Sequence, residues 1–254
     1  MMSKVAAFAA LLGLGCSSPR FAERSPKPLA MEQPGAQVIG IVRVPAPWYA
    51  PRFLIAGKFN DAVPEYEAID GLQSKYFTIS DDRRFGGIYV WKSRRDADAF
   101  YTDKWRVGIR ERRGADPDLL LLDAPYAIEG VTDVAGEPVG SRSVEYPGTA
   151  SLLLWSADEP GAATARLAHA NIAESGLLRA YVVRGVDRRV GLVALWATRE
   201  LAEAALSPTK IASLRADLSE SGQQVTYFDA PVMIDDAIRE GRTAPKLIRT
   251  AAAE

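Results

Sequence analysis

The chain has little of what metal and disulfide chemistry require. Its 254 residues include one cysteine, Cys16, and one histidine, His169. A zinc or copper centre built from several such side chains, or a disulfide framework, therefore cannot be assembled. The carboxylates Asp61, Asp81 and Asp82 stand in turn-like segments without the spacing of metal ligands. We therefore expect no metal site and no cofactor.

The chain also lacks a large excess of charge of one sign and the short sequence motifs of several common enzyme classes. The chain has 31 basic and 32 acidic side chains. Proteins that bind nucleic acid usually carry a clear basic excess, so this balance argues against a nucleic-acid partner. The segment after residue 35 contains no GxSxG, P-loop, GxGxxG or HExxH motif, which removes the signatures of several common enzyme classes.

The one strongly apolar run lies at the N-terminus. Lys4 precedes the run at residues 5–14, which is too short to span a bilayer as a mature helix. Gly15-Cys16 resembles the lipobox of bacterial lipoproteins, in which cleavage leaves the cysteine as a lipidated N-terminus, although Gly13 stands where that box usually has leucine. Ser17, in place of aspartate, resembles the outer-membrane sorting pattern. An ordinary secretory signal and an apolar tail are the alternatives.

These features predict the outer limits of the folded part. Residues 1–15 are expected to be a signal peptide, and residues 16–35 a lipidated cysteine with a Ser-, Pro- and charge-rich tether. We expect a lipoprotein attached to the membrane through the lipid at Cys16, facing the periplasm and residing in the outer membrane. Residues 239–254 lack a pattern and are expected to form a loose tail.

The folded part contains an internal duplication with a spacing of 105 residues. When residues 71–91 are set against residues 176–196 without a gap, eight of the 21 positions are identical. After a one-residue insertion, Asp123-Ala124-Pro125 recurs as Asp229-Ala230-Pro231. A repeat of this length matches a small domain and not a solenoid unit. We therefore expect two domains, residues 36–135 and 148–238, that pack as a pseudo-dimer within one chain. The identical pairs are Gly71/Gly176, Leu72/Leu177, Tyr76/Tyr181, Asp82/Asp187, Arg83/Arg188, Arg84/Arg189, Gly86/Gly191 and Trp91/Trp196.

Local patterns predict the same elements in both copies. In the first copy, strands are expected at residues 38–44, 72–79, 87–91 and 119–122, and a helix at residues 50–69 that Pro64 must kink or restart. Ser93 and Asp96 form a capping box that opens a second helix. In the second copy, strands are expected at residues 151–155, 177–183, 192–196 and 225–228, a helix at 161–174, and a helix cap at Thr198. The order β-α-β-β-α-β predicts an α+β chain of two ferredoxin-like domains.

The first copy resembles a known family. The segments at residues 71–77, 86–93 and 97–101 are similar to those of YdhR-type monooxygenases, in the dimeric α/β-barrel superfamily that includes antibiotic-biosynthesis monooxygenases. The likeness covers residues 38–131 and is weaker in the second copy. Members of this superfamily usually pair through their sheets, which implies a pseudo-dimeric α/β barrel here. The superfamily includes cofactor-independent oxygenases, haem-degrading enzymes, isomerases and members without shown activity. It shares no catalytic set, so the resemblance assigns no catalytic residue.

An aromatic set is the main candidate site. Alternation along the strand at residues 87–91 places Tyr89 and Trp91 on one face, and Ile88 and Val90 on the other. Aromatic walls with a few polar tips suit a planar organic ligand, although a role in the hydrophobic core is the favoured interpretation of these rings. Because Tyr89 becomes Ala194 while Trp91 is kept as Trp196, Tyr89 is the stronger candidate. The candidate ligand-binding residues are Tyr76, Tyr89, Phe100, Tyr101 and Trp105.

Two other features have a functional and a structural interpretation. The repeated Asp-Arg-Arg turns, which include Arg83 and Arg188, could bind an anion or a lipid headgroup, but a charged hairpin turn with internal pairing is the favoured interpretation. His169 could be a general base or a haem ligand, or a partly buried, idle residue on a helix flank. The first copy offers no equivalent histidine, so the duplication does not support a functional role.

Three hypotheses of function remain. The first is a cofactor-independent oxygenase that acts on a small aromatic molecule. The second is a non-catalytic lipoprotein that binds a small hydrophobic ligand or a protein partner, with a pocket that contains no titratable group of shifted pKa. The third is a structural duplicate whose two cores are filled. The small residues Ala180, Ala194, Ala204 and Ala205 of the second copy either remove a pocket or enlarge one.

Overall fold

The computed structural model describes residues 20–23, 37–47, 49–130, 132–135, 143–170, 176–215 and 225–235. The predicted signal peptide at residues 1–15, the lipidated Cys16 and the tail at residues 239–254 lie outside the described residues. Within the described ranges, no helix combines the length and the apolar character needed to cross a bilayer.

Both copies have the predicted order of elements. The first contains β2 (Gln37–Pro45), α1 (Arg52–Glu67), β3 (Leu72–Ser80), β4 (Arg84–Trp91), α2 (Arg94–Phe100), α3 (Asp103–Arg113) and β5 (Asp118–Glu129). The second contains β7 (Ser143–Ser156), α4 (Pro160–His169), β8 (Leu177–Arg184), β9 (Arg189–Trp196), α5 (Arg199–Ala205), α6 (Pro208–Arg215) and β10 (Thr226–Asp235). A small separate sheet pairs β1 (Arg20–Glu23) with β6 (Thr132–Ala135).

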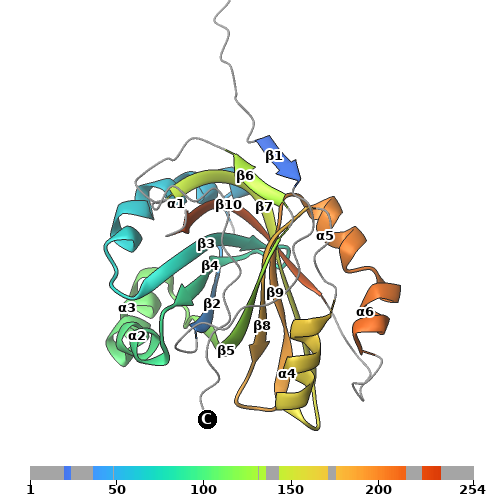
Figure 1. The fold of residues 1–254 in the computed structure, drawn as a ribbon. Coiled ribbons are helices and arrows are strands. Elements are labelled where there is room, and N and C mark those ends of the chain that lie inside the picture. Colours follow the sequence, from blue (N-terminus) through green and yellow to red (C-terminus); the bar gives the residue numbers. More distant parts are fainter. Residues whose placement is uncertain are drawn as a thin grey trace, which may run out of the picture.

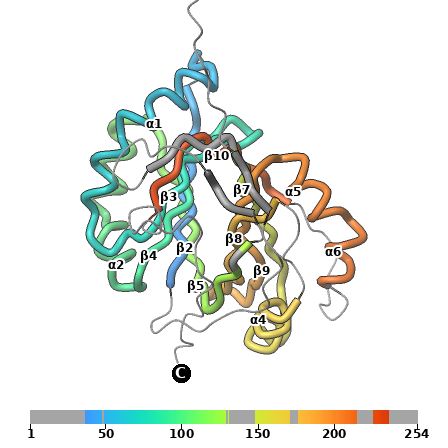
Figure 2. Tube along the Cα trace, turned by 45° about the horizontal axis from the view of Figure 1, so that its top comes forward, coloured from blue at the N-terminus to red at the C-terminus, as the bar shows by residue number. Residues whose placement is uncertain are grey.

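The eight strands of the two copies close into one barrel, in the order β10-β3-β4-β2-β5-β8-β9-β7. Each half keeps the ferredoxin-like strand order, and the halves join where β5 pairs with β8 and β10 pairs with β3, both antiparallel. Helices α1, α2 and α3 lie outside one half, and α4, α5 and α6 lie outside the other (Figures 1 and 2). The predicted pseudo-dimeric barrel is confirmed.

The repeated Asp-Ala-Pro motif marks a bulge in each strand that joins the two halves of the barrel. The register of β5 on β8 shifts between Asp123 and Tyr126, and that of β10 on β3 shifts between Asp229 and Val232. The proline of each motif has no amide hydrogen, so it is tolerated at such a bulge. The predicted strands at 119–122 and 225–228 were therefore too short, because each strand continues beyond the bulge, to Glu129 in β5 and to Asp235 in β10.

The repeated arginines of the hairpin turns have a structural role. Arg83 and Arg188 both adopt positive φ, 59° and 65°. Nη2 of Arg83 donates to the carbonyl oxygen of Pro47 at 3.4 Å, and Nη2 of Arg188 donates to that of Asp158 at 2.6 Å. Both carbonyls belong to the loop after the first strand of their copy, so each arginine links its hairpin to that loop by a hydrogen bond. The turns also contain the internal ion pairs Asp82–Arg84 and Asp187–Arg189.

The helices differ from the prediction in two ways. Pro64 lies inside α1, which runs as one helix from residue 52 to residue 67 and does not restart. The second predicted helix is two helices, because the hydroxyl of Thr102 accepts a hydrogen bond from the amide of Trp105 at 3.2 Å and opens α3. The predicted caps at Ser93 and Thr198 are confirmed. Residues 171–174 of the helix predicted in the second copy lie outside the described residues.

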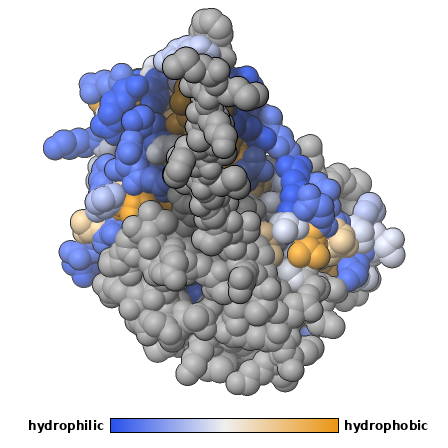
Figure 3. All heavy atoms as spheres, turned by 90° about the horizontal axis from the view of Figure 1, so that it is seen from above, coloured by the Kyte–Doolittle hydropathy of each residue, from blue (hydrophilic) through white to orange (hydrophobic). Residues whose placement is uncertain are grey.

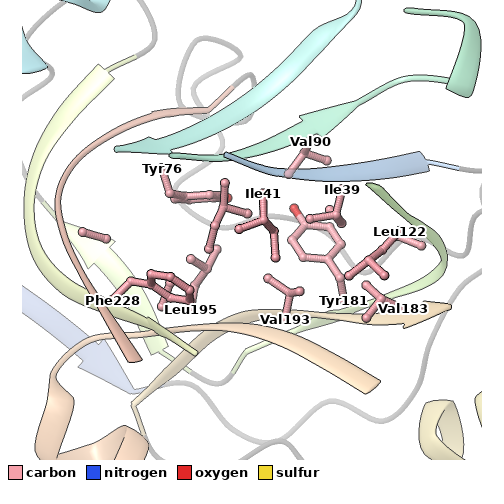
Figure 4. Packing of buried hydrophobic residues seen from close by; sticks show 14 of the residues in the cluster. Ile39, Ile41, Tyr76, Val90, Leu122, Tyr181, Val183, Val193, Leu195 and Phe228 are labelled. Carbon is pink, nitrogen blue, oxygen red and sulfur yellow. The ribbon is translucent and has the colours of Figure 1, made fainter. Parts of the chain in front are cut away.

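The apolar side chains form layers inside and outside the barrel. Residues from both halves point toward one another in the barrel interior (Figure 4). Burial of each large aliphatic or aromatic side chain contributes roughly 1.5–3 kcal/mol, so this shared core holds the two copies together. The described surface visible in Figure 3 is mainly hydrophilic, with separate hydrophobic patches.

Candidate functional site

The two faces of strands β3 and β4 separate the predicted aromatic set. On β4, Tyr89 and Trp91 face the helices and Ile88 and Val90 face the barrel interior, as predicted. On β3, a register shift between Leu72 and Ser74 changes which residues face outward. Tyr76 consequently pairs with Ile88 and faces the barrel interior. The prediction that Tyr76 lines a pocket between the sheet and the helices is therefore corrected.

Tyr76 belongs to a buried polar cluster inside the barrel. Its hydroxyl donates to Oδ2 of Asp235 at 3.4 Å, and Nη1 of Arg179 lies 3.3 Å from the same oxygen. Arg179 also donates to the hydroxyl of Tyr181 at 2.9 Å. Burial raises the pKa of both tyrosines. Tyr76 and Tyr181 are equivalent residues of the two copies and both point inward (Figure 4), so the cluster joins β3, β8 and β10.

Phe100 and Tyr101 fill the layer between the sheet and the helices α2 and α3. The ring centroid of Phe100 lies 5.1 Å from that of Trp91. Nε1 of Trp91 donates to the hydroxyl of Tyr101 at 3.3 Å. A Cβ on Gly40 would lie 2.5 Å from that hydroxyl, so the glycine makes room for the tyrosine ring. These two candidates pack as core residues next to the cavity described below, whose wall includes the other two, Tyr89 and Trp105.

A cavity of about 690 Å³ lies between the outer face of β2, β3 and β4 and the helices α1 and α3. Ligand sites in proteins commonly measure about 300–1,000 Å³, so the volume suits a small organic molecule. Tyr49 and Leu54 belong to its wall and are 71% and 55% exposed, which places them where the cavity opens. The deeper wall is formed by Val42, Val44, Ile55, Phe59, Ala62, Tyr66, Lys75, Phe77, Phe85, Gly86, Tyr89, Trp105 and Ile109.

Lys75 places an amine inside this aromatic wall. The residue is 2% exposed, and its Nζ lies 2.7 Å from the ring centroid of Tyr66, 3.9 Å from that of Phe77 and 4.7 Å from that of Tyr89. Attraction of an ammonium to a desolvated ring is worth about 2 kcal/mol, whereas burying an ion costs several kcal/mol. Burial therefore holds the pKa of Lys75 well below its usual value, and the exposed Glu65 opposes this only in part.

A pair of phenols lies beside the amine. The hydroxyls of Tyr66 and Tyr89 are hydrogen-bonded to each other, and burial raises the pKa of each. Both phenols therefore stay protonated, and the one that accepts the shared hydrogen bond keeps its own hydrogen for a ligand oxygen. The cavity thus combines aromatic walls, an amine whose charged form is destabilised by burial, and a hydroxyl donor. This arrangement can hold a planar aromatic molecule and accept a proton from it.

The second copy lacks this arrangement. Ala180 and Ala194 stand where the first copy has Lys75 and Tyr89, and a cavity of about 150 Å³ lies beside these alanines, between the sheet and the helices α5 and α6. Ala205 is buried and Ala204 is exposed, so the small side chains do not enlarge this cavity to the size of the first. Nε1 of Trp196 donates to the hydroxyl of Ser151 at 2.9 Å, which supports a structural role for this tryptophan.

The remaining candidates lie away from the cavity. His169 is exposed at the end of α4. In the described ranges, no group of three or more His, Cys, Asp or Glu side chains is placed to hold a metal ion. Lys75 was missed from the sequence. Its signal is the one charged residue of β3, which alternates with the apolar Phe77 and Ile79.

The comparisons with known proteins agree with this fold. At the level of sequence, no protein-family model and no curated protein matches the chain. A solved structure of a candidate monooxygenase from Fusobacterium nucleatum is similar with a TM-score of 0.56 at 7% identity, over 79% of this chain and 95% of that one. An anthrone oxidase-like protein is similar with a TM-score of 0.51 at 13% identity, over 84% and 95% of the two chains.

A further structural relative is a candidate monooxygenase from Lactobacillus acidophilus, with a TM-score of 0.50 at 10% identity over 83% of this chain and 98% of that one. Identities this low establish the shared fold and leave the activity open. The chain therefore has the α+β, closed-barrel fold of monooxygenase-like proteins built from ferredoxin-like units.

Proposed function

We propose that the first copy binds a small aromatic molecule in the cavity between α1, α3 and the barrel, and oxygenates it without a bound cofactor. The observation that carries this proposal is the cavity of about 690 Å³ whose aromatic wall contains the buried amine of Lys75. Support also comes from the fold, which is shared with candidate monooxygenases and an anthrone oxidase-like protein. A substrate of this class has an acidic C–H or O–H group conjugated with its rings.

The other two hypotheses fit the structure less well. A structural duplicate requires two filled cores, and the first copy contains a large cavity. A pure binding module was expected to have a pocket without a titratable group of shifted pKa, and Lys75 is such a group. A buried amine whose charged form is destabilised contributes little to binding an apolar ring, so its presence favours a reaction over storage.

The test uses anthrone as the probe. Ala62 on α1 belongs to the cavity wall, and Ala62→Leu would occupy part of the space. Gly57 lies on the same helix, where a Cβ would meet nothing within 4 Å, so Gly57→Leu is the matched control. Anthrone binding is followed by tryptophan fluorescence, and oxygenation by oxygen consumption in the presence of a chelator and without added flavin.

We expect the natural chain and Gly57→Leu to bind anthrone and consume oxygen, and Ala62→Leu to do both weakly. Equal binding by Ala62→Leu would place the ligand elsewhere, and oxygen consumption that stops on chelation would refute a cofactor-independent reaction. Tight binding without oxygen consumption would favour the non-catalytic alternative.

We also propose that the chain is a lipoprotein that faces the periplasm at the outer membrane. The support is the apolar run at residues 5–14 followed by Gly15-Cys16 and Ser17. Cys16→Ser should release the protein from the membrane fraction of the bacterial cell. Unchanged fractionation of this variant would contradict lipid attachment at Cys16.

A further inference from the structure

We propose that the amine of Lys75 is the base that removes the acidic proton of the aromatic substrate, a catalytic role that deepens the proposed oxygenase function and rests on it. The substrate class that follows is a carbon acid or phenol whose anion is delocalised over fused or linked rings. Such an anion reacts with oxygen directly, whereas its protonated form does not.

The position of Lys75 supports this role. Its side chain leaves β3 toward the helices, and its Nζ is surrounded by the rings of Tyr66, Phe77 and Tyr89. Within the described part of the chain, the amine makes no ion pair and no hydrogen bond that would engage its lone pair. Lys75 is therefore unlike Arg179, a largely buried cation whose charge is balanced by Asp235.

The neighbouring strand leaves room for this side chain. A Cβ on Gly87 of β4 would lie 3.1 Å from Cε of Lys75 and 3.2 Å from Cε2 of Tyr89. Contacts this close are tighter than those of ordinary packing, so a larger residue at Gly87 would press on both functional groups. The glycine thus keeps the amine beside the phenol that is hydrogen-bonded to Tyr66.

The reaction balances with oxygen as the co-substrate. Nζ accepts a proton from a CH2 group between aromatic rings and becomes an ammonium ion, while the substrate becomes a carbanion. The carbanion bonds to O2 to form a peroxide anion, which takes the proton back from Nζ. Loss of the second C–H proton and cleavage of the O–O bond give a carbonyl and one water. The carbon loses four electrons and O2 gains four, so CH2 and O2 become C=O and H2O.

The amine must be uncharged to act, so turnover should decline as the pH falls and Lys75 becomes protonated. Because burial lowers the pKa of Lys75, the pH range in which its amine can accept a proton extends below the range of an ordinary lysine. Other groups that face the cavity also affect this pH profile. They are Lys58, Asp61, Glu65 and Tyr66 from α1, Tyr89 from β4 and Arg113 from α3.

The experiment compares the full chain with Lys75→Met, and with Lys104→Met as a control at an exposed site on α3. The first probe is 4-nitrophenol, which turns yellow when it loses its proton. Bound 4-nitrophenol should show the yellow anion at a pH below its own pKa in the natural chain and the control. Lys75→Met should bind the probe, as seen by tryptophan fluorescence, without the yellow colour.

The second probe is anthrone, whose oxygen-dependent conversion should slow by about 10²–10⁴-fold in Lys75→Met, the usual contribution of a general base. In Lys75→Ala, added propylamine should restore part of the rate by occupying the vacated space, whereas propanol should not. If Lys75→Met still ionises 4-nitrophenol and oxidises anthrone at the natural rate, Lys75 is not the base although the cavity remains the site. If the natural chain binds neither probe, the proposed function fails as well.

Discussion

The buried amine of Lys75 makes the stability of this protein depend on pH. In the unfolded chain Lys75 is protonated up to its usual pKa of 10.5, whereas burial lowers the pKa in the folded chain well below that value. Between the two pKa values the unfolded state binds one more proton than the folded state. The free energy of unfolding therefore rises with pH in this window, by at most about 1.4 kcal/mol per pH unit for a single proton.

Replacing Lys75 with methionine removes this proton linkage. The methionine side chain has similar length and is apolar, so it can occupy the space among the rings of Tyr66 and Phe77 without the cost of desolvating an amine. We therefore expect Lys75→Met to be more stable than the natural chain at neutral pH. The difference should shrink steadily as the pH rises toward 10.5, where the unfolded lysine also loses its proton.

Urea unfolding at a series of pH values from neutral to mildly alkaline measures this difference directly. Lys104→Met, at an exposed site on α3, is the matched control and should change stability little at every pH. A Lys75→Met variant that is less stable than the natural chain, or whose advantage grows with pH, would show that the folded protein holds Lys75 as a charged ammonium. The role of Lys75 as an uncharged base would then be wrong.

Three further substitutions test how contacts elsewhere in the barrel and its helices contribute to stability, each measured by urea unfolding. Asp235→Ala leaves the buried guanidinium of Arg179 without its carboxylate and should cost about 3–5 kcal/mol. Gly40→Ala places a methyl group 2.5 Å from a tyrosine hydroxyl and should cost about 1–3 kcal/mol with little change in the cavity. Asp81→Ala removes the exposed pair with Arg199, 2.8 Å long, and should cost less than about 1 kcal/mol, a difference that added salt removes.

The duplication explains why the fold could be predicted from the sequence. Each copy has weak local signals, but a cap or a turn that occurs at equivalent positions of both copies is supported twice. Gly71 and Gly176 illustrate this, since both adopt positive φ, 79° and 83°, and both end the loop before an equivalent strand. The Asp-Ala-Pro motif was visible as a repeat, but its meaning depends on pairing between strands of different copies, which local patterns do not report.

The site was only partly predictable, because a one-residue bulge reverses which side chains of a strand face the helices and which face the barrel interior. Simple alternation from Leu72 places Tyr76 on the same face as that leucine. The bulge between Leu72 and Ser74 instead places Lys75 on the helix side together with Leu72. An aromatic residue therefore moved from the expected pocket into the barrel, and a lysine took its place. Such a bulge depends on the pairing of β3 with β4, so the sequence of β3 alone does not reveal it.

The residues kept in both copies and the residues that differ perform different tasks. The shared glycines, arginines and tryptophans hold turns, hairpins and the packing of helices on the sheet, so they are needed wherever the fold is used. The exchange of Lys75 for Ala180 and of Tyr89 for Ala194 removes the amine and one phenol of the pair while the backbone pairing is kept. Because strands of both halves close the barrel, the second copy supports the first structurally, and at the positions of the lysine and the phenol it has alanines. Under the proposed function, this difference places the reactive site in the first copy, beside the buried lysine.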